Sequence, residues 1–127
     1  MNKYGMAAIE AANELRKNRN VTPNEAWEDS TLRIFGNTSS QSKGCPKSTF
    51  LGLCELGLIK GVTKGEFTRS KKNKEYARKS VEFIRSSDIK VFTVMQLWEK
   101  VNEGRVVKHN CQMDVVLALY ENGMLEL

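Results

Sequence analysis

A polar loop in the first half of the chain carries the residues best suited to bind an anion. Residues 39–47 combine small polar side chains, a glycine and two lysines, and a helix is expected to open at Pro46. The free N–H groups and the dipole of a helix start favour a negative charge. The residues expected to hold a phosphate are Lys43, Gly44, Lys47 and Ser48. A surface loop ahead of an ordinary helix cap is the alternative, and a Walker A loop is excluded because Gly-Lys-Ser/Thr is missing.

The positive charge of the chain is concentrated around this loop. Residues 43–79 hold ten Lys or Arg and three Glu, a local net charge of +7, whereas the whole chain has a net charge of +5. A localised basic stretch is typical of a surface that binds nucleic acid, and also of a solubilising surface. The run Arg69-Ser70-Lys71-Lys72-Asn73-Lys74 opens a helix. Positive charge there opposes the helix dipole, so an anionic partner would offset the cost.

Three cysteines and one histidine are the other chemically reactive candidates. Cys45 lies at a helix start beside lysines, which lowers the pKa of a thiol, but a catalytic thiol needs a base and His109 is the only histidine. Cys45, Cys54, Cys111 and His109 have the ligand count of a zinc site without its close ligand pairs. We therefore assign no catalytic, metal or cofactor residues, and the unpaired cysteines favour a reducing compartment.

Six helices are expected to position these residues. They span residues 3–17, 22–35, 46–57, 71–85, 94–102 and 111–122. Residues 22–25 and 93–96 are capping boxes, Ser70 is a further cap, and Gly57 and Gly123 are left-handed C-caps. Residues 58–62 and 66–68 flank Thr-Lys-Gly and predict a small hairpin, and residues 89–92 predict one short strand.

The two halves of the chain match each other in order. The third and sixth helices align without a gap at an offset of 66 residues. The matched pairs are Cys45 and Cys111, Leu51 and Leu117, Leu53 and Leu119, Glu55 and Glu121, and Gly57 and Gly123. Thr22 and Trp27 correspond to Thr93 and Trp98 in the same order. We therefore expect tandem units at residues 1–69 and 70–127, which share a core or form one domain.

Two resemblances follow from these residues. The order helix, connector, helix, loop, helix and extended tail resembles a winged helix-turn-helix, in which the third helix enters the major groove and the hairpin forms a wing. The loop before the third helix is longer than the turn of the simple motif. The stretch KGCPKSTFLGLCE at residues 43–55 resembles a family of small bacterial proteins of unknown function, and the likeness continues through residues 73–77. That family implies no activity, cofactor or site.

The predicted fold is mostly α, with six helices in two three-helix, winged-helix-like repeats and a minor β-hairpin. The predicted function is non-enzymatic binding of nucleic acid, duplex DNA in particular. Further phosphate contacts would come from Lys60, Lys64 and Arg69 on the wing and from Lys71, Lys72 and Lys74 at a helix start. The alternatives are a module that recognises an acidic protein or associates with itself, and a small enzyme of unknown type. No apolar run approaches the roughly 20 residues of a membrane span, so we expect a cytoplasmic protein without a membrane partner.

Overall fold

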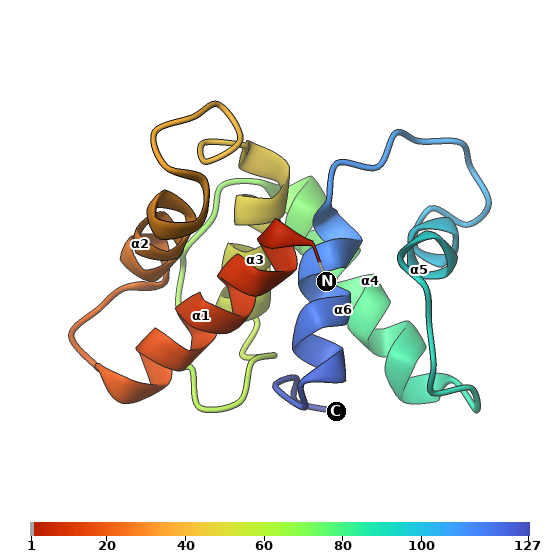
Figure 1. The fold of residues 1–127 in the computed structure, drawn as a ribbon. Helices are drawn as coiled ribbons and strands as arrows, with labels where there is room; N and C mark the ends of the chain where they lie inside the picture. The colour runs from red at the N-terminus through yellow and green to blue at the C-terminus, as the bar shows by residue number, and fades with distance from the viewer. Residues whose placement is uncertain (1) are drawn as a thin grey trace.

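Six α-helices form the protein, and the computed structural model describes residues 2–127 (Figure 1). Their bounds are α1 Lys3–Lys17, α2 Pro23–Phe35, α3 Gly44–Glu55, α4 Lys71–Ser86, α5 Val94–Val101 and α6 Gln112–Glu121. The helical class and the six predicted helices are confirmed. The third helix starts two residues earlier than expected because Pro46 lies inside its first turn, where a missing N–H breaks no intrahelical bond.

Side-chain caps fix where four of the helices begin, and at the first of them Asn2 Oδ1 accepts a hydrogen bond from Gly5 N at 2.9 Å. Thr22 Oγ1 accepts a hydrogen bond from Glu25 N at 3.1 Å, and the Glu25 carboxylate accepts one from Thr22 N at 3.0 Å. Thr93 and Gln96 form the same reciprocal pair at the start of α5. Ser70 Oγ accepts from the backbone N–H of the third residue of α4. These caps satisfy backbone donors that a helix start otherwise leaves free, so the local sequence alone sets these boundaries.

Glycines end α3 and α6 in the same way. Gly57 has a φ of +72° and Gly123 a φ of +67°, a left-handed conformation that glycine adopts without steric cost. Leu58 N donates to Leu53 O at 3.0 Å. The corresponding bond after α6 runs from Met124 N to Leu119 O at 2.9 Å. Both ends are Schellman motifs, which return the chain sharply along the last helical turn.

The helices pack across the midpoint of the chain. Helix α1 lies against α2 and α6, and α3 lies against α4 and α6, so each half contacts the other closely. Four alanines of α1, Ala7, Ala8, Ala11 and Ala12, have no exposed surface and let its neighbours approach. One hydrophobic cluster contains residues from all six helices. The two extended tails meet in an antiparallel bridge between Ile59 and Leu125.

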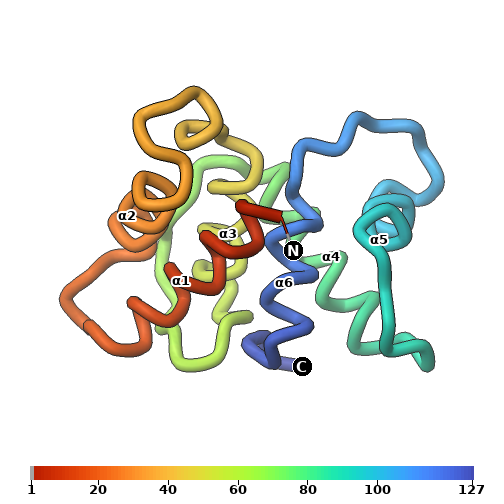
Figure 2. Tube along the Cα trace, viewed as in Figure 1, coloured from red at the N-terminus to blue at the C-terminus, as the bar shows by residue number. Residues whose placement is uncertain are grey.

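The prediction of a minor β-hairpin, and of a wing formed by it, is wrong. Residues 58–62 do not pair with residues 66–68, because Ile59 pairs with Leu125 and the N–H groups of Phe67 and Thr68 donate to the Glu55 carboxylate. The tail of α3 instead runs back between α2 and α3 to the start of α4, as the yellow-green tube in Figure 2 shows. Residues 89–92 also form no strand. Within residues 2–127 the tail bridge is the only β pairing.

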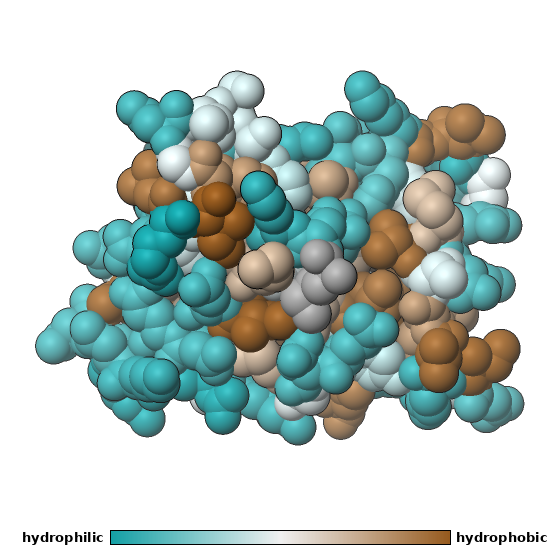
Figure 3. Space-filling model, viewed as in Figure 1, coloured by the Kyte–Doolittle hydropathy of each residue, from teal (hydrophilic) through white to brown (hydrophobic). Residues whose placement is uncertain are grey.

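Exposed apolar side chains are concentrated in the second half. Among the described residues, Ile89 is 67% exposed, Val91 81%, Met95 59% and Val106 fully. Figure 3 shows this contrast, with brown atoms on the side of α5 and mostly teal atoms around α1. Within residues 2–127 no helix has both the length and the apolar composition that crossing a bilayer needs. The two halves of the chain therefore differ in the apolar surface that they expose.

Candidate anion-binding site

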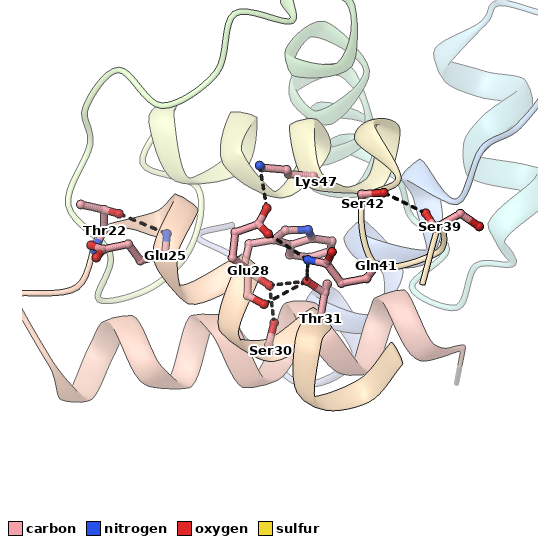
Figure 4. A network of polar contacts seen from close by, with 10 residues as sticks. Thr22, Glu25, Glu28, Ser30, Thr31, Ser39, Gln41, Ser42 and Lys47 are labelled. Carbon is pink, nitrogen blue, oxygen red and sulfur yellow. Dashed lines mark hydrogen bonds and ion pairs between the residues drawn. The ribbon is translucent and has the colours of Figure 1, made fainter. Parts of the chain in front are cut away.

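The polar loop ahead of α3 is held firmly against α2. The Gln41 side chain is buried and its Nε2 donates to the Glu28 carboxylate at 2.8 Å and to Thr31 Oγ1 at 3.1 Å (Figure 4). Tyr4 donates its hydroxyl proton to Ser40 O at 2.8 Å. These bonds tie the loop to two helices. The backbone that leads into α3 is therefore positioned by the fold.

Two of the predicted phosphate ligands are engaged by carboxylates. Lys47 Nζ lies 2.7 Å from Glu28 Oε1, and this bond lowers the pKa of Glu28 (Figure 4). Lys74 Nζ lies 2.6 Å from the Glu55 carboxylate. Hydrogen bonds from Lys74 and from the Phe67 N–H, together with that of Thr68, lower the pKa of Glu55 to about 2. Lys47 and Lys74 are therefore partly neutralised, and an anion would compete with Glu28 and Glu55 for them.

The remaining predicted ligands fall into two groups at opposite ends of α3. Lys43, Gly44 and Ser48 lie at its start, and Arg69, Lys71 and Lys72 lie where α4 begins beside it. Lys60 and Lys64 follow its end, and the aliphatic part of Lys64 covers Gly57. Twelve helical residues at about 1.5 Å each separate the groups by about 18 Å. The ten predicted residues therefore do not form one compact site.

The starts of α3, α4 and α6 converge on one hollow, which we call the α3–α4–α6 hollow. Its lining residues are Cys45, Lys72, Asn73, Tyr76, Trp98, Val107, Lys108, Asn110 and Gln112. The first belongs to α3, Lys72 and Asn73 to α4, and Gln112 to α6. Figure 1 shows these three helix starts close together under the loop that joins α5 to α6. Lys72 and Lys108 place two cations at the point where three positive helix ends meet.

Of these three helix starts, that of α3 has no side-chain partner among the described residues for its first backbone donors, whereas Ser70 caps α4 and Met113 N in the first turn of α6 donates to His109 Nε2. Neither Lys43 ahead of α3 nor Cys111 ahead of α6 makes a side-chain cap hydrogen bond within residues 2–127. Gly44 is exposed, and a Cβ atom there would meet nothing within 4 Å. An uncapped helix start offers N–H groups to an anion. The backbone at the start of α3 is therefore accessible and not capped by a side chain that the structure describes.

The reactive side chains near the hollow are not arranged for catalysis. Burial lowers the pKa of His109, and the positive charge of Lys43 lowers it further. The Asp114 carboxylate acts in the opposite direction and raises this pKa. His109 Nε2 accepts a hydrogen bond from Met113 N at 3.0 Å, so this nitrogen is engaged. Burial also raises the pKa of the Cys111 thiol. Within residues 2–127 no three His, Cys, Asp or Glu side chains form a group that could hold a metal ion.

The sequence identified only part of the hollow. Of its lining residues, Lys72 was predicted as a ligand, whereas Lys108 and the α6 start were not. The predicted correspondence of Cys45 with Cys111 was the available signal, and the structure starts α3 one residue before Cys45 and α6 one residue after Cys111. Nothing in the local sequence indicates that those starts meet.

Comparison with known proteins gives the chain a family. Residues 1–126 match a family of unknown function (DUF6979). The chain belongs to this family. The predicted membership of a family without a known activity is thereby confirmed. No curated protein and no solved structure matches the chain, so its function must be argued from its own surface.

Proposed function

We propose that the protein binds nucleic acid without catalysing a reaction, and that it holds backbone phosphates at the α3–α4–α6 hollow. The observation that carries this proposal is the convergence of three helix starts on Lys72 and Lys108. Each helix start contributes the equivalent of about half a positive charge. Lys43 adds a further charge nearby, since its field acts on both His109 and Cys111. The site therefore suits a group with several negative oxygens.

The contacts available in the hollow predict binding without sequence preference. Lysine ammonium groups and helix N–H donors recognise phosphate oxygens, which are the same at every nucleotide. The hairpin that would have formed a wing is absent from the described residues, and α3 opens onto the hollow with its start. We therefore infer contact with the backbone and not reading of base edges by α3.

The second cationic group suggests how a long ligand would lie. Lys60 and Lys64 are exposed about 18 Å from the hollow, which corresponds to about five base pairs of duplex at 3.4 Å each. A duplex that occupies the hollow would reach this group as a secondary contact. A single phosphate or a short nucleotide would use the hollow alone.

The test is a fluorescence-anisotropy titration with a labelled DNA duplex over a range of salt concentrations. We expect Lys72→Glu/Lys108→Glu to weaken binding by tenfold or more and to flatten the slope of log K against log salt by about two. Lys60→Glu/Lys64→Glu changes the net charge equally and serves as the matched control, with a smaller loss. Absence of binding at low salt, or equal losses for both variants, would contradict the proposal. Polyglutamate that competes as well as DNA would favour an acidic protein partner instead.

We also propose that residues 1–69 and 70–127 are copies of one three-helix unit built around a common core. Support comes from hydrogen bonds that repeat at the offset of 66 residues. Lys60 N donates to Met124 O at 2.9 Å. The reciprocal bond runs from Glu126 N to Leu58 O at 2.8 Å. The bridge thus joins equivalent positions of the two halves, as an approximate two-fold axis between them requires.

A further inference from the structure

One side of α3 is covered by the chain itself, and the matching side of α6 is bare. Leu51 is 4% exposed and its counterpart Leu117 is half-buried. Glu55 has a side chain that is 12% exposed, whereas Glu121 is exposed. The backbones of the two helix ends make the same hydrogen bonds. The difference therefore lies in what covers them.

The cover of α3 is the extended segment at residues 61–68. The N–H groups of Phe67 and Thr68 donate to the Glu55 carboxylate at 2.8 and 3.2 Å. The aliphatic part of Lys64 lies so close to Gly57 that a Cβ on that glycine would come within 2.7 Å of Lys64 Cγ. The Phe67 ring folds over Gly65, where a Cβ would clash with it. The covering segment thus has a Lys-Gly-x-aromatic pattern.

The equivalent surface on α6 is an open hollow with an apolar wall. Its lining residues are Lys90, Val91, Phe92, Tyr120, Glu121 and Gly123. A Cβ at Gly123 would meet nothing within 4 Å. Phe92 occupies the position before the capping threonine that Val21 occupies in the first half, and its ring stands edge-on to Tyr120 at 5.7 Å. Val91 is 81% exposed and extends this apolar surface into solvent.

We propose that this hollow binds an extended segment of another polypeptide, with the chemistry that residues 61–68 show on α3. Two of its backbone N–H groups donate to the Glu121 carboxylate. A lysine lies with its aliphatic part over Gly123, and apolar side chains cover Val91 and Phe92. The occupant follows from the chain's own structure, because a segment of this kind already lies on the same backbone in the first half. This inference rests on the proposed repeat of the two halves and is independent of nucleic-acid binding.

The probe is a synthetic peptide with the sequence GVTKGEFTRS, which is residues 61–70 of this chain, added to the isotope-labelled full-length protein. We expect saturable amide shifts at residues 90–92 and 117–123, with a dissociation constant of about 1 mM or lower. Glu121→Gln should weaken binding about tenfold, since hydrogen bonds to a charged acceptor are lost. Val91→Asp should weaken it as well. Glu10→Gln, an exposed change on α1, is the matched control and should bind as the wild type does.

Three results would overturn the inference. The first is a lack of saturable shifts at a peptide concentration of about 5 mM, which is several times the expected dissociation constant. The second is shifts around Glu55 and Gly57, which would mean that the peptide displaces the chain's own segment. The third is dimerisation through residues 90–92 and 117–123 in light scattering and relaxation measurements without peptide, which would make a second copy the occupant. A peptide with Lys64 and Phe67 both changed to alanine must bind more weakly.

Discussion

The ends of α3 and α6 have the same backbone and opposite surroundings. Both end at a glycine with positive φ and the same two Schellman bonds. The first end carries a covering segment that engages Glu55, whereas the second presents Glu121 to solvent. The way in which each helix ends is therefore determined by a few neighbouring residues, and the chain contains such residues at both ends. Whether a helix end is covered depends on an extended segment such as residues 61–68, and within residues 2–127 only the first half has one.

The same contrast extends to the chemistry of the two surfaces. The positive charge excess lies in residues 43–79, which span the boundary between the halves, whereas only the first half closes its own apolar side with residues 61–68. The second half leaves Ile89, Val91 and Met95 exposed, and Val91 lines an open hollow. The two proposed binding surfaces therefore differ in kind, one for an anion near helix starts and one for a peptide near a helix end.

The largest expected effect tests whether the two halves share one core. Leu53 and Leu119 occupy matched positions of the proposed repeat, and neither has exposed surface. We expect Leu53→Ala and Leu119→Ala each to lower the free energy of unfolding by about 3 kcal/mol, because both create a cavity. Urea denaturation followed by far-UV circular dichroism should show one transition for both. Two separate transitions, with only one of them shifted by each variant, would mean that the halves fold independently.

The next effect separates the covered helix end from the bare one. Glu55→Gln should destabilise the protein by about 1–2 kcal/mol, since it removes a charged acceptor from Lys74 and two backbone N–H groups and part of the gain is screened by solvent. Glu121→Gln makes the same chemical change at an exposed position and should alter stability by less than about 0.5 kcal/mol. Chemical denaturation at neutral pH measures both.

The pH dependence of stability provides the control for this pair. The pKa of Glu55 is about 2 in the folded protein against an ordinary value of 4.5. A lowered folded-state pKa stabilises the protein above pH 4.5, and this stabilisation is lost as the pH falls from 4.5 to about 2. Glu55→Gln should therefore lose less stability over that interval than the wild type or Glu121→Gln. Parallel curves for all three proteins would show that Glu55 does not carry this dependence.

The smallest effect concerns the two tryptophans. Trp98 Nε1 donates to Val107 O at 2.7 Å, whereas Trp27 Nε1 is buried without a partner among residues 2–127. Trp98→Phe leaves a carbonyl unsatisfied and Trp27→Phe removes an unsatisfied donor. We expect Trp98→Phe to cost about 1 kcal/mol more than Trp27→Phe. Thermal unfolding of both variants measures the difference, and an equal or larger loss for Trp27→Phe would contradict the expectation.

Most helix boundaries could be predicted because each depends on a few neighbouring residues. Thr22 with Glu25 and Thr93 with Gln96 satisfy donors within one turn, so their spacing in the sequence is sufficient. Whether residues 58–68 form a hairpin could not be predicted from neighbouring residues in this way. Its strands had the right composition, but Glu55 accepts the N–H groups of Phe67 and Thr68 from a different element. A competing acceptor in the tertiary structure decided that segment.

The candidate site also combines features that could be predicted from the sequence with features that could not. The sequence by itself determined that α3 starts beside lysines and that α4 starts in a basic run. It also determined that Gly57 and Gly123 end α3 and α6. These features could be predicted because caps, glycines and charges act over a few residues. Only the tertiary structure brought the starts of α3, α4 and α6 together, added Lys108 to Lys72 and turned Lys47 and Lys74 toward Glu28 and Glu55. The physical reason is that helix packing sets which ends meet, and packing depends on the whole buried core.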